Sequence, residues 1–378
     1  MAPLNILHVL RAPVGGLFRH VLDLSREQIA RGHSVGLIAD LSTGGNRADD
    51  ALRQIEPSLA LGLSRTPMPR DIGPGDAPAL AHVMRRIANS KADVVHGHGA
   101  KGGAYARLAF GRSRALRVYT PHGGSLLYHH DTLAGKFYLT TERFLMRRGH
   151  LFLFESAFSA ETFKRKIGQP RGLVRIVHNG VTPAEFEPVE PAADATDVVF
   201  IGELRMLKGI DVLIDAIASL RRDGRNLSAT LVGDGPDRDA FHAQVERLGL
   251  SATVRFMPAM PARQAQALGR IMVAPSRAES LPYVVLEAAA SGKPQITTRV
   301  GGIPEIYGPL SDRLVEPGDV PALARAIVRT LDHAEERTEI VRKLRERVAT
   351  SFSVERMANG VLAGYAAALE NLHKAGRR

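Results

Sequence analysis

Cysteine is absent from this 378-residue sequence. Its absence excludes disulfide bonds, thiol catalysis and thiolate metal sites, and it is typical of a protein that stays in the reducing cytoplasm. The sequence also lacks any apolar run of the roughly 18 residues that a membrane-spanning helix needs. Its beginning, MAPLNILHVLRAPVGG, indicates a strand followed by a glycine turn rather than a signal peptide. We therefore expect a cytoplasmic protein.

Acidic residues are scarce in the first half of the chain. Residues 1–181 contain 25 Lys and Arg against 13 Asp and Glu, a net charge of +12, whereas residues 182–378 contain 25 against 26, a net charge of −1. The basic clusters at 143–148 and 164–166 could contact anionic lipid headgroups, nucleic acid or an acidic substrate. A solvated basic surface without a partner is the alternative interpretation.

The sequence does contain a regular alternation of short β-branched runs and amphipathic stretches, which is typical of parallel α/β sheets. With 44% hydrophobic and 24% charged residues, the chain can bury the cores of about two such domains. The predicted strands of the first half are NILHVL, SVGLIAD, DVVHGHG, RVYTPHG, HLFLFES and LVRIVHNG. Those of the second half are DVVFIGEL, SATLVGDG, TVRFMPA, IMVAPS, QITTRVGG and DRLVEP.

The segment between the two halves, TPAEFEPVEPAADATD, is rich in proline, alanine and acidic residues and follows neither the helix nor the strand period. We therefore place a linker at 182–197, between two Rossmann-like α/β domains at 1–181 and 198–352. Both are expected to be doubly wound and to face each other across a cleft. Residues 353–378 are expected to form one amphipathic helix, which in one interpretation crosses back to the first domain.

Ligands of open α/β sheets bind beyond the carboxyl ends of the strands. In the second domain, Gly202 and Glu203 follow such a strand, and Arg205 and Lys208 come three residues apart where a helix begins. Two cations beside the N–H groups of a helix N-terminus form a site for a diphosphate. Two exposed basic residues on a helix surface are the alternative.

The first domain offers two candidate features. Gly15 and Gly16 separate the first strand from the first helix and would let a ligand approach the backbone closely. His122, in YTPHGG, ends an apolar strand at its carboxyl edge, so its imidazole is expected to project into the cleft. A glycine pair in an ordinary turn and a structural histidine are the alternatives.

Two glutamates flank the apolar run of ESLPYVVLE. Glu279 is predicted in a loop and Glu287 on the following helix, where Ser280 could cap the helix and Pro282 is tolerated in the first turn. Glu287 could accept hydrogen bonds from both hydroxyls of a ribose, and Glu279 could contact a sugar above the helix N-terminus. A solvated Glu287 and a capping Glu279 are the alternative.

Three other motifs are interpreted as structural. The glycines of HGHGAKGG spell the dinucleotide fingerprint, but no acidic residue follows about 20 positions later to hold a ribose. The acidic pair of GDGPDRD is interpreted as belonging to the first turn of a helix. His96 and His98 are expected to point to opposite faces of a buried strand, and no metal site is predicted.

Together these motifs resemble those of the family 4 glycosyltransferases, retaining enzymes of the GT-B fold that use nucleotide sugars. The resemblance rests on the first glycine pair, TPHG, HNGV, GELRMLKG, VGDGP, the two glutamates of E-x7-E, and VGGIPE, in the family's order over nearly the whole chain. Many members have glycine where this sequence has Ser280 and Pro282. Sequences with proline there resemble the members that build exopolysaccharide, capsule and lipopolysaccharide.

The resemblance implies a role for each candidate residue. Glu287 would bind the donor ribose and Glu279 the transferred sugar. Arg205 and Lys208 would neutralise the diphosphate leaving group, and His122 would touch the donor sugar near the acceptor. The other residues implied to contact the donor are Gly15, Gly16, Gly202, Glu203, Gly233, Ser280, Leu281, Pro282 and Tyr283. The resemblance implies no cofactor and no catalytic metal. Physical chemistry agrees with this, because two cations and a helix N-terminus can stabilise a departing diphosphate.

We therefore predict a retaining, metal-independent hexosyltransferase that moves a sugar from UDP or GDP to a glycan or lipid-linked acceptor in cell-surface polysaccharide synthesis. Its partners would be the nucleotide sugar, the acceptor and the anionic inner membrane surface, which the basic first domain would meet, but not nucleic acid. A nucleotide-sugar epimerase of the same fold and a basic, non-catalytic protein that binds glycan or nucleic acid are the alternatives.

Overall fold

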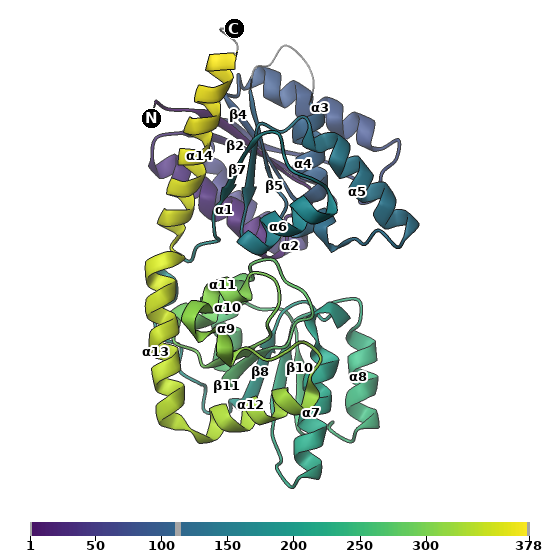
Figure 1. Cartoon of the computed structure of the whole chain (residues 1–378), viewed down its shortest axis with the longest axis vertical. Helices are drawn as coiled ribbons and strands as arrows, with labels where there is room; N and C mark the ends of the chain where they lie inside the picture. Colours follow the sequence, from purple (N-terminus) through teal and green to yellow (C-terminus); the bar gives the residue numbers. More distant parts are fainter. Residues whose placement is uncertain (1, 110–114, 376–378) are drawn as a thin grey trace. The chain divides into compact units, whose positions relative to one another are not determined.

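The computed structural model describes residues 2–109 and 115–375 (Figure 1). Contacts divide the chain into an N-terminal unit, Met1–Asn179 with Val354–Arg378, and a C-terminal unit, Gly180–Ser353. The segment predicted as a linker is assigned to the C-terminal unit, where it forms a short 3-10 helix, Pro183–Phe186, and runs into the first strand of that unit.

Seven parallel strands form the sheet of the N-terminal unit, in the order β3-β2-β1-β4-β5-β6-β7. Their bounds are β1 (Asn5–Leu10), β2 (Ser34–Asp40), β3 (Gly62–Thr66), β4 (Val94–His98), β5 (Leu116–Thr120), β6 (Leu151–Phe154) and β7 (Leu173–Ile176). All but β3 overlap the strands predicted for the first half, which confirms that prediction. Strand β3 was missed because none of its residues is fully buried, so its sequence carries no apolar pattern.

Helices follow the strands of this unit. Their bounds are α1 (Gly15–Ala30), α2 (Gly45–Ile55), α3 (Asp76–Asn89), α4 (Gly99–Leu108), α5 (Leu133–Met146), α6 (Ala157–Lys166) and α14 (Val354–Ala375). Among the described residues of the whole chain, no helix is long and apolar enough to cross a membrane.

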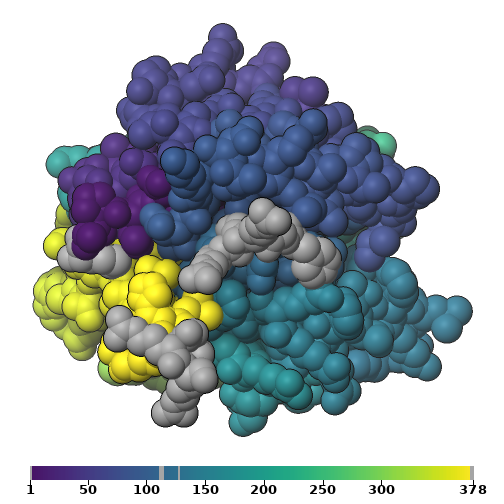
Figure 2. Space-filling model, turned by 90° about the horizontal axis from the view of Figure 1, so that it is seen from above, coloured from purple at the N-terminus to yellow at the C-terminus, as the bar shows by residue number. Residues whose placement is uncertain are grey.

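Helix α14 belongs to the N-terminal unit although it ends the chain. It packs against α1 and against β5, β6 and β7. Gly360 and Gly364 permit this close approach, because Cβ atoms there would lie 3.0 Å from Val177 and 3.3 Å from Leu151. Its far end (yellow) reaches the surface beside the first residues of the chain (purple) in Figure 2. Tyr365 of this helix is fully buried and reaches the sheet.

Five parallel strands form the sheet of the C-terminal unit, in the order β10-β9-β8-β11-β12. Their bounds are β8 (Thr196–Ile201), β9 (Ala229–Val232), β10 (Val254–Met257), β11 (Gly269–Ala274) and β12 (Gln295–Thr297). The predicted strand DRLVEP is wrong. Its first residues lie in a 3-10 helix, Gly308–Arg313, and only Val315 forms a bridge, with Thr298.

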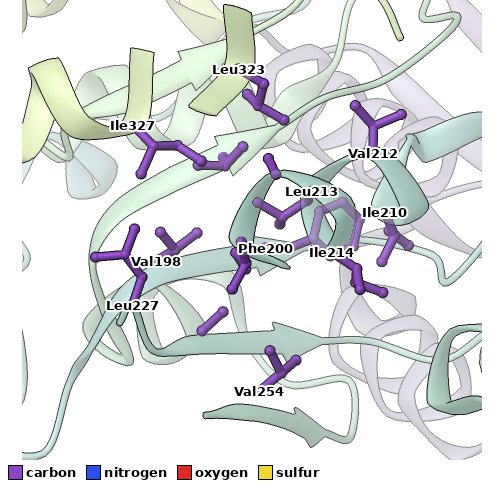
Figure 3. Packing of buried hydrophobic residues seen from close by; sticks show 14 of the residues in the cluster. Val198, Phe200, Ile210, Val212, Leu213, Ile214, Leu227, Val254, Leu323 and Ile327 are labelled. Atoms are coloured by element: carbon purple, nitrogen blue, oxygen red, sulfur yellow. The ribbon is translucent and has the colours of Figure 1, made fainter. Parts of the chain in front are cut away.

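The helices of the C-terminal unit are α7 (Ile210–Arg222), α8 (Arg238–Arg247), α9 (Ala262–Ala267), α10 (Tyr283–Ala290), α11 (Ile303–Tyr307), α12 (Val320–Asp332) and α13 (Ala334–Ser351). Helix α7 buries Ile210, Leu213, Ile214 and Ile217 at the spacing of one helix face. Figure 3 shows three of these side chains packed with Phe200 of β8. The loop between β8 and α7 is thus anchored at both ends by buried apolar residues.

Candidate active site

The first group of predicted site residues lies where β8 ends. Residues 202–209, here called the β8 loop, connect β8 to α7. The backbone N–H of Leu204 donates to the carbonyl of Asp234 (2.9 Å), and that of Met206 donates to a carboxylate oxygen of Asp237 (2.7 Å). The Leu204 side chain is also fully buried. The neighbouring β9–α8 connection therefore fixes the shape of the β8 loop.

Glycines allow the ends of β8 and β9 to meet backbone to backbone. A Cβ atom on Gly233 would lie 1.8 Å from the carbonyl oxygen of Gly202. At the end of the β8 loop, Gly209 has a φ of +69°, and a Cβ atom there would lie 2.0 Å from the carbonyl oxygen of Pro275. These positions therefore exclude larger residues by packing alone, and the predicted donor contacts of Gly202 and Gly233 stay predictions.

Each of the two cations of the β8 loop is paired with a carboxylate. Lys208 Nζ donates to an oxygen of Glu279 (2.6 Å), which also accepts from the hydroxyl of Ser276 (2.7 Å). Arg205 lies 3.8 Å from Glu203, and both side chains are about half exposed, at 43% and 50%. Each cation therefore has a carboxylate as its partner, and a diphosphate would compete with the two carboxylates for the two cations.

The helix that follows Glu279 begins later than the sequence suggested. Tyr283 is the first residue of α10, and Pro282, with extended backbone, is the N-cap residue. The N-cap position is therefore Pro282 and not Ser280, where the sequence predicted it. Leu281 is buried and packs in the hydrophobic cluster beneath the helix. Pro282 has no N–H to offer an anion at this helix end.

The two glutamates come from different elements, as the sequence predicted. Glu279 lies in the loop before α10, and Glu287 lies on α10, about one turn after Tyr283. Glu287 is half-buried between the fully buried Leu286 and Ala288. The apolar run between the glutamates therefore comprises the end of the loop and the first turn of α10, and its buried residues hold both glutamates in position.

Two glycines after β12, which belong to the motif VGGIPE, support Glu279. The N–H of Gly302 donates to the carbonyl of Ser280 at 2.6 Å. Gly301 has a φ of +58°, and a Cβ atom there would lie 1.9 Å from the carbonyl oxygen of Glu279. The motif VGGIPE was the available signal, since a glycine pair after a strand permits such close backbone contact.

The second group of predicted site residues lies in the N-terminal unit. Gly15, with a φ of +61°, and Gly16 are exposed at the start of α1. His122 follows β5 and has a φ of +51°, in the left-handed region that a histidine rarely adopts. Such strain is typical of functional positions.

A cavity of about 490 Å³ opens beside His122 within the N-terminal unit. Its lining residues include His98, three basic residues and three tyrosines: Arg11, Arg70, Lys101, Tyr105, Tyr128 and Tyr138. Lys101 Nζ donates to a carboxylate oxygen of Asp76 at 2.6 Å. The cavity therefore combines aromatic surface with hydrogen-bonding groups, as a sugar-binding site does.

The rings of His20 and His98 contact His122, and those of His8 and His96 contact His98. The five residues together are here called the histidine cluster: His8, His20, His96, His98 and His122. The expectation that His96 and His98 point to opposite faces was wrong. Their ring centroids lie 3.9 Å apart, because residues two apart on a strand share one face.

Burial keeps the histidine cluster uncharged at neutral pH. It lowers the pKa of His8 and His20 to about 4. It also lowers the pKa values of His96, His98 and His122 well below the usual histidine range, with the neighbouring histidines adding to the effect. His8 was not predicted as a site residue, because NILHVL was interpreted only as a buried strand. A polar residue within this apolar run was the available signal.

Two family models match consecutive parts of the chain. Residues 14–185 match the model described as Glycosyltransferase Family 4. Residues 195–333 match the model described as Glycosyl transferases group 1. The first match covers most of the N-terminal unit and a few residues beyond it, and the second match covers most of the C-terminal unit. Strand β1 and helices α13 and α14 lie outside both matches.

Similar proteins support the same assignment. Glycogen synthase of Mycobacterium tuberculosis (strain ATCC 25618 / H37Rv) is 24% identical over 383 residues, which cover 94% of this chain and 92% of the relative. The D-inositol 3-phosphate glycosyltransferase of Nocardia farcinica (strain IFM 10152) is 27% identical over 343 residues, which cover 83% and 75%. The solved structure of Anabaena HepE in complex with UDP and glucose matches with a TM-score of 0.79 and 21% identity, over 96% of this chain and 99% of that one.

These findings confirm the predicted family and the predicted α/β fold with two Rossmann-like units. The structure contributes two parallel sheets with connecting helices, and the two family models match all of their strands except β1. The chain belongs to the family 4 glycosyltransferases and is a glycosyltransferase of the GT-B fold.

Proposed function

We propose that the protein is a retaining, metal-independent hexosyltransferase that takes a sugar from a UDP- or GDP-linked donor and gives it to a glycan or lipid-linked acceptor in cell-surface polysaccharide synthesis. The observation that carries this proposal is the pair of cations on the rigid β8 loop. Arg205 and Lys208 lie beyond the carboxyl end of β8, where ligands of such sheets bind. Both are held by carboxylates that an incoming diphosphate can displace.

The donor contacts proposed for the C-terminal unit follow from this placement. Arg205 and Lys208 bind the diphosphate, helped by the backbone at Leu281 and Tyr283. Glu287 accepts hydrogen bonds from the ribose hydroxyls. Once Lys208 turns to the phosphate, Glu279 is released to contact the transferred sugar.

In this proposal the enzyme accelerates the reaction by stabilising the diphosphate leaving group. As the sugar–phosphate bond breaks, negative charge grows on the diphosphate, and the two cations stabilise that charge more strongly than they stabilise the ground state. The acceptor attacks from the face that the diphosphate leaves, and a phosphate oxygen takes the acceptor proton. The anomeric configuration is therefore retained without a separate enzymic base, and His122 keeps its expected role as a contact of the transferred sugar.

We expect Glu287→Ala to weaken binding of the donor nucleotide by about 5- to 150-fold. The ribose hydroxyls would lose their acceptor, which costs about 1–3 kcal/mol. Isothermal titration of the nucleoside diphosphate into wild type and variant measures the change. Glu246→Ala, on the exposed side of α8 in the same unit, is the control and should bind as wild type does. Equal affinities of Glu287→Ala and wild type would refute the ribose contact.

The proposed acceptor site is the cavity of the N-terminal unit beside His122. Its tyrosines offer faces for sugar rings, and its arginines offer donors for anionic groups of a lipid-linked glycan. The similarity to the D-inositol 3-phosphate glycosyltransferase of Nocardia farcinica supports an acceptor that carries an anionic phosphate group.

We propose that helix α5 brings the N-terminal unit to the cytoplasmic face of the membrane. One side of α5 exposes Leu133, Phe137 and Phe144, at 87%, 53% and 51%. The exposed Lys136 and Arg143 lie beside this apolar stripe, because residues three or four apart share a helix face. An apolar stripe bordered by basic residues is typical of helices that lie in an anionic bilayer surface. We call this surface the α5 face.

The second basic cluster of the sequence contributes less to such a surface. Lys166 Nζ donates to the carbonyls of Leu126 (2.6 Å) and Tyr128 (2.8 Å). Lys164 lies 3.7 Å from Glu161. These two lysines already have partners within the unit, so the α5 face carries the proposal.

We expect Arg143→Glu combined with Phe144→Ser to reduce binding to anionic vesicles at least tenfold. Each basic residue near such a surface contributes about 1 kcal/mol, and the phenyl ring adds burial. Cosedimentation with phosphatidylglycerol-containing vesicles at several salt concentrations measures binding. Arg47→Glu, an exposed change on α2 in the same unit, is the charge-matched control for the arginine change. Binding that is equal for neutral and anionic vesicles at every salt concentration would refute an electrostatic membrane contact.

A transfer assay tests the proposed function against its rivals. Labelled UDP- and GDP-sugars are incubated with the protein and a membrane lipid extract, with a chelator present. A transferase incorporates label into lipid only when acceptor is present and releases the nucleoside diphosphate. An epimerase would convert the donor without acceptor, and a binding protein for glycan or nucleic acid would leave the donor unchanged.

A further inference from the structure

The histidine cluster is larger than the proposed reaction requires. Only His122 has a role in sugar transfer, which leaves four buried imidazoles of the N-terminal unit without a function. They come from β1, α1 and β4. Because buried polar groups are usually satisfied by partners, their hydrogen bonds indicate what the cluster can hold.

One nitrogen of His20 has no partner. His20 Nδ1 donates to the side-chain oxygen of Asn179 at 3.0 Å, since an amide oxygen can only accept. The lone pair of this imidazole is therefore on Nε2. Among the described residues, Nε2 has no hydrogen-bond partner, although His20 is only 2% exposed. A buried nitrogen lone pair costs free energy unless it accepts a hydrogen bond or binds a metal ion.

A chain of hydrogen bonds determines which nitrogen of His98 carries the lone pair. Nε2 of His8 donates to the side-chain oxygen of Gln28 at 2.8 Å, so Nδ1 of His8 accepts from Nε2 of His98 at 2.9 Å. The lone pair of His98 is therefore on Nδ1. That atom lies 3.1 Å from Nε2 of His122.

Three nitrogens converge at this point. One nitrogen each of His20, His98 and His122 lies within 4.8 Å of the other two. Two nitrogens bound to a tetrahedral zinc ion with 2.0–2.1 Å bonds are about 3.3 Å apart, close to the distance that separates His98 from His122. Outer hydrogen bonds to Asn179 and His8 already hold two of the rings in the form that a metal needs.

Another group of three, formed by His8, His96 and His98, is excluded by its hydrogen bonds. His96 Nδ1 lies 2.7 Å from the hydroxyl of Tyr365, and His96 Nε2 lies 2.8 Å from the hydroxyl of Thr120. Both nitrogens of His96 are thus engaged. Only the group with His20 has a ligand atom without a partner among the residues that the structure describes.

We propose that His20, His98 and His122 form a binding site for a divalent transition-metal ion of the Zn²⁺ type. The ion takes the place of the proton that His122 Nε2 shares with His98, and His122 then carries its proton on Nδ1. A fourth position remains for water from the cavity, which both His98 and His122 line. Burial lowers the pKa of all three imidazoles, which favours the neutral form that binds a metal.

The ligand set selects the class of ion. Imidazole nitrogens suit Zn²⁺, Co²⁺, Ni²⁺ and Cu²⁺, whereas Mg²⁺ and Ca²⁺ require oxygen ligands. The three residues offer no oxygen, so Mg²⁺ should not occupy the site. An ion bound here withdraws His122 from the donor sugar. It therefore inhibits transfer, a consequence that rests on the proposed function, while the reaction itself needs no metal.

Metal binding is tested without any substrate. The protein is stripped with a chelator and titrated with Zn²⁺ by calorimetry, and separately with Co²⁺ followed by its visible spectrum. We expect one Zn²⁺ per chain, no heat from Mg²⁺ at the same concentrations, and the intense absorption of tetrahedral Co²⁺. No saturable Zn²⁺ binding, or the weak spectrum of hydrated Co²⁺, would overturn the proposal.

Variants locate the ion. Asn179→Ala keeps all three ligands but removes the orienting bond to His20, and it should weaken Zn²⁺ binding about 10- to 100-fold. His20→Gln should weaken it further, with folding checked by circular dichroism. His373→Gln changes an exposed histidine of α14 and should bind Zn²⁺ as wild type does. Equal loss in His373→Gln, or unchanged binding in both other variants, would place the ion elsewhere and refute the site.

The two proposals fail separately. Zinc binding that depends on His20 in a protein without transferase activity would leave the metal site intact and refute the proposed function. Transfer activity in a protein that binds no zinc would support the proposed function and refute the metal site. If both stand, Zn²⁺ should inhibit wild type at concentrations near its measured dissociation constant, and the chelator should restore activity.

Discussion

Replacement of Lys208 by alanine is expected to lower kcat of sugar transfer by about 100- to 1000-fold. The ammonium group is proposed to stabilise charge that develops on the diphosphate only as the sugar departs, and removing one such group costs about 2.7–4 kcal/mol of transition-state stabilisation. Steady-state assays with saturating donor measure kcat and KM separately. We expect the larger change in kcat, because the stabilisation is greatest in the transition state.

Stability should hardly change in this variant. The ion pair of Lys208 and Glu279 is partly solvated, with side-chain exposures of 25% and 11%, so its loss costs little. Arg222→Ala, which removes an exposed cation from the far end of α7, is the control and should retain full activity. A Lys208→Ala protein with unchanged kcat and a raised KM would contradict the proposed role, since it would show ground-state binding alone.

Glu142→Ala is expected to lower the free energy of unfolding by about 3–5 kcal/mol. Glu142 of α5 is 3% exposed and accepts from Arg107 of α4, which is fully buried. The Arg107 guanidinium also lies 3.8 Å from the centre of the Tyr119 ring. Without Glu142 the guanidinium would be a buried charge without a counter-charge, which is the most costly way to break such a pair. Urea denaturation followed by circular dichroism measures the change.

Two further variants test whether the loss of stability in Glu142→Ala comes from the unpaired charge of Arg107. Arg107→Met combined with Glu142→Leu removes both charges and should lose much less stability than Glu142→Ala. Asp50→Ala breaks the exposed pair with Arg53 on α2 and should cost less than about 1 kcal/mol. An equal loss in the double variant and in Glu142→Ala would mean that packing, and not charge, holds α4 to α5.

The consequence of this ion pair for function lies in the position of α5. This helix contributes Tyr138 and Glu142 to the cavity proposed for the acceptor, and it carries the α5 face proposed for the membrane. The buried ion pair between Arg107 of α4 and Glu142 of α5 therefore fixes the position of the helix that carries both the α5 face and part of the acceptor cavity. Glu142→Ala should consequently lose transfer to lipid-linked acceptor before it loses binding of donor.

Strands with apolar sequences were predictable, whereas exposed or irregular ones were not. The runs that became β1 and β4 are buried on both faces, so their composition alone indicated strands. Strand β3 has only partly buried residues, and DRLVEP has the composition of a strand although its first two residues are the end of a 3-10 helix. The composition of a short segment does not show whether that segment will form an edge strand of a sheet.

The candidate site was predictable where a motif lies in one continuous stretch. Arg205 and Lys208 could be assigned to one loop because they are three residues apart after a strand. The partners of that loop and of Glu279, Asp237 and Gly301, come from other strand ends, and spacing along the chain gives no measure of those distances. The same limit applies to His20, which meets His122 only because α1 packs beside the strands.

The helix start at α10 shows a different limit. A serine before a proline is typical of a capped helix, and Ser280 was predicted to serve as the cap. Its carbonyl instead accepts from Gly302, so tertiary contact with the loop after β12 holds this segment outside the helix. The start of this helix therefore depends on packing that the sequence does not display.

The central claim is that the C-terminal unit binds a nucleoside diphosphate sugar through Arg205, Lys208 and Glu287 without a metal ion. A panel of nucleotide sugars, titrated by calorimetry in the presence of a chelator, tests it most directly. We predict that one UDP- or GDP-sugar binds saturably and that, at 100 times its dissociation constant, it stabilises the fold by about 2.7 kcal/mol. Binding of no nucleotide sugar, or binding only after Mg²⁺ is added, would contradict the claim.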